Sequence, residues 1–120
     1  MVLPKYKMIM KKLRPLYYKR DGSPYTPGKR GLLQLARDMK KPRHIGDTHL
    51  WWGGRVSTVW LGLDHSFFLG ARPLIYETMV FPRGSCCELD MERYSTKAEA
   101  VDGHKRMVLK WFIPFSLIRL

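Results

Sequence analysis

Three ionisable side chains have the chemistry of a general acid–base group. Asp64 and His65 end one β-prone run of the sequence, and Glu77 lies inside the next. By strand alternation Glu77 shares its face with apolar residues, and a carboxylate in such surroundings needs a partner. A Glu–His–Asp group could catalyse hydrolysis as general acid and base. In the structural alternative, Glu77 accepts hydrogen bonds from a turn backbone or pairs with an arginine such as Arg55 or Arg72. This alternative is favoured because neither a nucleophile motif nor a second matched carboxylate accompanies these residues.

The histidines and cysteines form no recognisable metal motif. His44 and His49 are spaced like a zinc-finger pair, but no Cys-x-x-Cys precedes them. Cys86 and Cys87 are adjacent, so on a strand their side chains would point to opposite faces. The glycine pair 53–54 lacks the Gly-Lys-Ser or Gly-Lys-Thr of a phosphate loop. We therefore predict no metal, no cofactor and no disulfide framework.

Positive charge is concentrated in the first third of the chain. Residues 1–43 hold 13 basic side chains and two acidic ones, whereas residues 44–120 hold nine and eight. A concentrated positive segment attracts polyanions over about 8 Å at physiological salt, and interspersed tyrosines could stack on bases. The alternative is a solvated face that only keeps the protein soluble. The candidate nucleic-acid-binding residues are Lys5, Lys7, Lys11, Lys12, Arg14, Lys19, Arg20, Lys29 and Arg30.

Large apolar residues occur at expected turns and loops. Trp51 and Trp52 precede the glycine pair, and Phe67 and Phe68 follow the Asp64–His65 dipeptide. Exposed aromatic side chains are common anchors of protein interfaces. The same residues could instead fold back over a small core, since a chain of this size needs the burial. The sequence favours the two interpretations equally.

The elements that must position these residues follow from periodicity. Residues 55–63 are apolar on both alternating faces, which predicts a central strand covered on both sides, with Trp60 in the core. Thr96 and Glu99 form a capping box for a last helix that Pro114 ends. The expected fold class is α+β: an antiparallel β-sheet of three to five strands packed against a C-terminal α-helix, with a short N-terminal helix. The expected elements are strands at 16–20, 44–51, 55–63, 73–81 and 87–94 and helices at 32–39 and from 96 onward.

Length and composition indicate one domain. The chain has 120 residues, of which 45% are apolar. We divide it into a basic N-terminal leader (1–15), a single α+β domain (16–113) and an apolar C-terminal tail (114–120). No stretch approaches the roughly 18 apolar residues of a spanning helix, and the N-terminus has no secretory-signal pattern. We expect a cytoplasmic protein with no membrane partner.

Several longer stretches resemble a known group of proteins. These are Val-Ser-Thr-Val-Trp-Leu-Gly-Leu-Asp-His (56–65), Tyr-Glu-Thr-Met-Val-Phe (76–81) and Arg-Tyr-Ser-Thr (93–96), followed by Glu-Ala (99–100) and Gly-His (103–104). The sequence resembles a family of small phage and prophage proteins over most of residues 16–108. The resemblance implies a mobile-element origin and action inside an infected bacterial cell. It supplies no activity and no catalytic residues.

The function expected from the sequence is binding rather than catalysis. We expect a non-enzymatic phage-encoded protein that acts on a host or phage protein or nucleoprotein complex. An inhibitor of a bacterial defence nucleoprotein, similar to anti-CRISPR proteins, is one such function. The first alternative is a nucleic-acid-binding accessory protein that uses the basic first third on DNA or RNA. The second is a small hydrolase that uses Asp64, His65 and Glu77.

Overall fold

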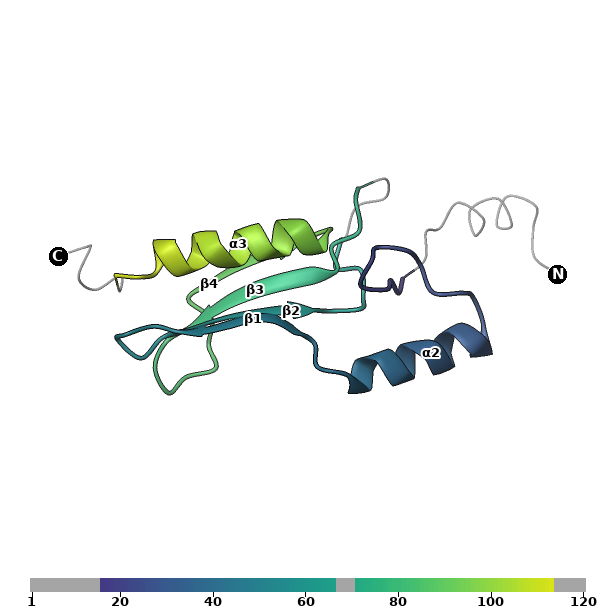
Figure 1. The fold of residues 1–120 in the computed structure, drawn as a ribbon, viewed down its shortest axis with the longest axis horizontal. Helices are drawn as coiled ribbons and strands as arrows, with labels where there is room; N and C mark the ends of the chain where they lie inside the picture. Colours follow the sequence, from purple (N-terminus) through teal and green to yellow (C-terminus); the bar gives the residue numbers. More distant parts are fainter. Residues whose placement is uncertain (1–15, 67–70, 114–120) are drawn as a thin grey trace.

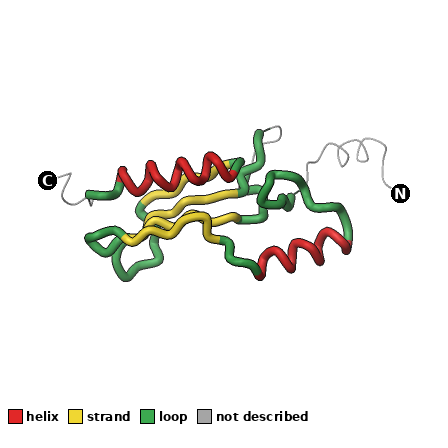
Figure 2. Tube along the Cα trace, in the orientation of Figure 1, coloured by secondary structure: helices red, strands yellow, loops and turns green. Residues whose placement is uncertain are grey.

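The computed structural model describes residues 16–66 and 71–113. It has the expected α+β class: a four-stranded antiparallel sheet packed against a C-terminal helix, with a helix before the sheet (Figures 1 and 2). No helix in these two ranges is long and apolar enough to cross a membrane. The elements are α2 (Lys29–Lys40), β1 (His44–His49), β2 (Arg55–Trp60), β3 (Tyr76–Phe81), β4 (Asp90–Tyr94) and α3 (Lys97–Lys110).

The sheet is a meander in the order β1-β2-β3-β4, and α3 contacts all four strands. In Figure 1, α3 lies along one face of the sheet. Among the described residues no helix covers the opposite face, so the prediction that β2 is covered on both sides is wrong. The expected second apolar face depended on Leu61 and Leu63. β2 ends at Trp60, and Gly62 then takes a left-handed conformation with φ 73°, so both leucines lie beyond the strand.

Close approach of α3 to the sheet depends on two glycines. A Cβ atom built on Gly103 would lie 2.1 Å from the hydroxyl oxygen of Tyr94, and one on Gly46 would lie 2.8 Å from the ring of His104. Both are sterically impossible without movement of the neighbour. Trp60, the last residue of β2, is 0% exposed and packs in one cluster with Ala100 of α3 and Leu35 of α2, so its predicted place in the core is confirmed.

A chain of polar side chains crosses this buried interface. The Tyr94 hydroxyl donates to Thr78 Oγ1 (3.0 Å), and Thr78 and Thr58 share a hydrogen bond of 2.6 Å. His104 bonds Thr58 through Nδ1 (2.7 Å) and Thr48 through Nε2 (2.8 Å). Burial lowers the pKa of His104, so the imidazole is held neutral with one ring nitrogen donating and the other accepting.

The predicted element boundaries are partly shifted. The expected strand at 16–20 is reduced to isolated bridges, Tyr17 with Leu63 and Tyr18 with Pro24. The strands expected to begin at 73 and 87 begin at 76 and 90. The capping box is confirmed, because Thr96 Oγ1 accepts a hydrogen bond from the backbone N–H of Glu99 (3.1 Å).

Candidate nucleic-acid interface

Helix α2 attaches to the end of the sheet through one stripe of its surface. Gly31 and Leu35 are buried and Met39 is half-buried, one turn apart along the helix. Leu35 packs in the same cluster as Trp60, and a Cβ atom on Gly31 would lie 1.7 Å from the carbonyl oxygen of Thr26. This inner stripe fixes which side of α2 faces solvent.

The outward side of α2 carries four exposed basic residues: Lys29, Arg30, Arg37 and Lys40, here called the α2 basic face. Lys29, Arg37 and Lys40 fall on one line at helical spacing, with the exposed Leu33 between them and Arg30 beside them. Because α2 has 12 residues, the face extends along about 18 Å.

None of these four side chains makes an ion pair or hydrogen bond with the residues that the structure describes. The first turn of α2 contains no acidic residue, and its N-cap, Gly28, provides no side-chain hydrogen bond. Lys29 and Arg30 therefore lie at the positive end of the helix dipole, an arrangement that disfavours the helix by a few tenths of a kcal/mol or more. A bound anion would remove that repulsion.

The cations of the sheet and α3 differ, because most of them have a carboxylate partner. Arg93 and Glu77 form the most buried pair (2.9 Å), with Glu77 only 7% exposed. The other pairs are Arg55 with Asp47 (2.7 Å), Arg72 with Glu99 (2.5 Å), Arg106 with Glu92 (3.1 Å) and Lys110 with Asp90 (2.7 Å).

Two further candidates, Lys19 and Arg20, lie beside α2 in a hollow of about 330 Å³. Arg20 has structural roles: its guanidinium donates to the carbonyl of Pro42 (2.7 Å) and lies 4.9 Å from the centre of the Trp60 ring. Asp38, in the same hollow, accepts from the Tyr25 hydroxyl, and this hydrogen bond lowers the pKa of the carboxyl group. The hollow is therefore partly neutralised, and the α2 basic face is the stronger candidate for binding a polyanion.

Four of the nine predicted nucleic-acid-binding residues fall on this region, and Lys5, Lys7, Lys11, Lys12 and Arg14 lie outside the described residues. Sequence reasoning missed Arg37 and Lys40. Their spacing from Lys29 by multiples of about one helical turn was the available signal.

The acid–base candidates have structural partners. Asp64 Oδ1 accepts the backbone N–H groups of Ser66 (2.8 Å) and Leu74 (2.9 Å), so this carboxylate joins two parts of a loop. Glu77 pairs with Arg93 rather than with Arg55 or Arg72, because Arg93 is its direct neighbour in the register of β3 and β4. The backbone N–H of His65 donates to the carbonyl of Leu74 (2.9 Å).

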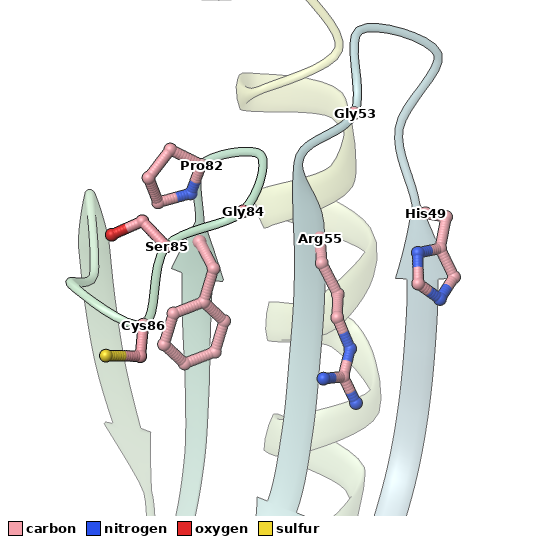
Figure 3. Close-up of a pocket in the computed structure, with 8 residues that line it drawn as sticks. His49, Gly53, Arg55, Pro82, Gly84, Ser85 and Cys86 are labelled. Carbon is pink, nitrogen blue, oxygen red and sulfur yellow. The ribbon is translucent and has the colours of Figure 1, made fainter.

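A cleft of about 380 Å³ lies at the other end of the molecule, between the β1–β2 turn and the β3–β4 loop (Figure 3). His49, Arg55 and Cys86 are among its lining residues. Arg55 is held by two hydrogen bonds to Asp47 (2.7 and 2.9 Å), which lower the pKa of that carboxyl group and neutralise the cation. Cys86 and Cys87 are exposed free thiols in the loop and not on a strand. The described residues contain no cluster of three or more metal-ligating side chains.

Of the aromatic residues predicted to form an interface, Trp51 and Trp52 make hydrogen bonds within the fold, and Trp51 is also exposed. The indole N–H of Trp52 donates to the carbonyl of Trp111 (2.9 Å), and that of Trp51 to the carbonyl of Phe112 (2.6 Å). Both bonds join the β1–β2 turn to the end of α3. Trp51 nevertheless stays 64% exposed, and Phe67 and Phe68 lie outside the described residues.

Comparisons with protein-family models, with curated proteins and with solved structures give no match to this chain.

Proposed function

We propose that the chain is a non-enzymatic, phage-encoded binding protein that acts on a host or phage nucleoprotein and contacts its nucleic acid through the α2 basic face. One observation carries the proposal. The four cations of this face are exposed and have no partner among the described residues, whereas five of the eight cations in residues 44–113 are paired with carboxylates.

The geometry suits phosphate contacts better than base recognition. A basic helix face about 18 Å long can follow several phosphates of one strand, and the major groove of B-DNA, about 12 Å wide, admits a helix. Lysine and arginine contacts to phosphate position a protein without reading sequence. We therefore expect binding that depends strongly on salt and weakly on sequence.

A binding role also agrees with the state of the acid–base candidates. Asp64 holds two backbone amides and Glu77 holds an arginine, so each carboxylate has a structural function that needs no substrate. An inhibitor of a bacterial defence nucleoprotein is one form of the proposed activity, since such a target presents both protein and nucleic acid.

The test compares two variants that lose the same side-chain types. Arg37→Gln/Lys40→Gln removes two charges from the α2 basic face, and Arg83→Gln/Lys97→Gln removes two exposed charges, one from the turn after β3 and one from α3. At low salt, duplex DNA should bind the first variant at least about tenfold more weakly than the parent, and the second nearly as well as the parent. Equal losses in the two variants would show that only total charge matters.

A further inference from the structure

The outer side of α3 carries a short stripe of exposed residues that no described element covers. Its members are Ala98, Asp102, Lys105 and Leu109, here called the α3 outer stripe, and they are spaced by four, three and four residues. This spacing places all four on one side of the helix, opposite the buried Gly103 and its neighbours. Figure 1 shows α3 on the outside of the molecule with the sheet on its inner side.

The two charges in the middle of this stripe have no partner. Asp102 and Lys105 form no ion pair or hydrogen bond within the described part of the chain, although carboxylates elsewhere on α3 and β4 are paired. The residues at both ends are apolar, and Leu109 is 76% exposed. The stripe therefore has the order apolar, acidic, basic, apolar.

We propose that this stripe binds a second copy of the chain, with the two α3 helices antiparallel about a twofold axis. An axis that passes between residues 103 and 104 relates position 98 to position 109 and position 102 to position 105. Asp102 then faces the partner's Lys105, and Lys105 faces the partner's Asp102. At each end, the small Ala98 faces the partner's Leu109. The pattern is thus its own complement in charge and in size.

The contact is small, because a helix of 14 residues is about 21 Å long. An interface of this length falls at the low end of specific interfaces, so the dimer is a weak, concentration-dependent one. In this dimer the paired α3 helices leave α2 uncovered, and the two α2 basic faces lie at opposite ends of the dimer. Two such faces on one nucleic acid would bind with avidity, and this gain in affinity rests on the proposed function. The formation of the dimer does not.

The test is a charge swap measured by sedimentation equilibrium of the full-length protein without nucleic acid. Asp102→Lys places like charges at both central contacts, and Lys105→Asp does the same with the opposite sign. Each variant alone should self-associate at least about tenfold more weakly than the parent, because like charges in direct contact are costly. The two variants mixed in equal amounts should form a mixed dimer, because every central contact is again between opposite charges. The double variant should self-associate like the parent.

Circular dichroism of each variant establishes that it is folded, and the mixture controls for any change in helix stability. A parent protein that stays monomeric at the highest concentration reached would overturn the proposal. So would single variants that associate like the parent, or a mixture that does not recover association. A parent that dimerises but does not bind DNA would leave this inference intact and refute the proposed function instead.

Discussion

Two regions of the molecule differ in how their charged side chains are arranged. One is the segment that contains α2, and the other is the body, which is formed by the sheet and α3. Residues 16–43 hold eight basic and two acidic side chains, whereas residues 44–113 hold eight of each. In the body, five of these eight cations are paired with carboxylates, such as Arg93 with Glu77 and Arg106 with Glu92. Lys41, just beyond α2, pairs with Asp38, but the four cations of the α2 basic face have no acidic partner in residues 16–66 and 71–113. The comparison shows that the sequence gives the density of charge, whereas the structure is needed to tell paired cations from unpaired ones.

The two regions also differ in how they are buried. The body forms its core from residues such as Tyr76 and Val80, which are fully inside. The segment before β1 adds Tyr18, Tyr25 and Leu35 to one end of that core, around Trp60. The side chain of Trp60 thus contacts both regions. Substitutions at Trp60 and in the body therefore show how much each set of contacts contributes to the stability of the protein.

The largest expected effect is that of Trp60→Ala, which removes the side chain that both regions contact. Truncation of a fully buried aromatic side chain should lower the free energy of unfolding by about 3–5 kcal/mol. Trp51→Ala is the matched control, since Trp51 is mostly exposed. Urea denaturation should give a large shift of the midpoint for the first variant and a small one for the second. Equal midpoints for the Trp60 variant and the parent would show that the regions do not share a core.

A smaller effect is expected for Glu77→Gln, which removes the most buried ion pair of the body. The loss of a charge-assisted hydrogen bond to Arg93 should lower stability by about 1.5–3 kcal/mol, while Glu88→Gln in the exposed loop should change little. A thermal melt measures both. DNA binding at a temperature where the variants are folded should be unchanged. If the Glu77 variant were as stable as the parent but lost a hydrolytic turnover, the residue would be catalytic and our assignment wrong.

The smallest effect concerns the polar chain under α3. Burial lowers the pKa of His104 below its ordinary 6.5, although the charge of Asp47 opposes this. The unfolded state therefore binds more protons than the folded state, and stability should fall as the pH decreases from about 6.5 toward the folded-state value. Urea midpoints between pH 7.5 and 5 measure this slope, which His104→Gln should reduce and His49→Gln, at an exposed position, should not. An unchanged slope in the His104 variant would show that another group titrates.

The fold could be predicted because its local signals agree with one another. β-branched and aromatic residues in 55–60 and 76–81, the turn signals at 53–54 and 82–85, and the capping box at Thr96 all favour one arrangement. The uncovered sheet face was missed because two leucines after Trp60 extended the apparent alternation past the end of β2.

The candidate site was predicted only in part, because pairing of charges depends on register and packing. The partner of Glu77 became evident only once β3 and β4 were aligned, which places Arg93 opposite it. In the same way, the sequence shows where cations are abundant but not which are neutralised. Arg20 is held by Pro42 and Trp60, whereas Arg37, which was not among the predicted nucleic-acid-binding residues, has no partner in the described part of the chain.

The most direct test of the central claim is the salt dependence of DNA binding. The parent should be compared with a variant in which all four residues of the α2 basic face are replaced by glutamine, with residues 1–15 identical in both. Each phosphate contact contributes about 0.9 to the slope of log affinity against log salt on duplex DNA. The slope for the variant should therefore be smaller in magnitude by up to about 3.6, the value for four contacts. Equal slopes for the two proteins would contradict the account, because the α2 basic face would then make no phosphate contact.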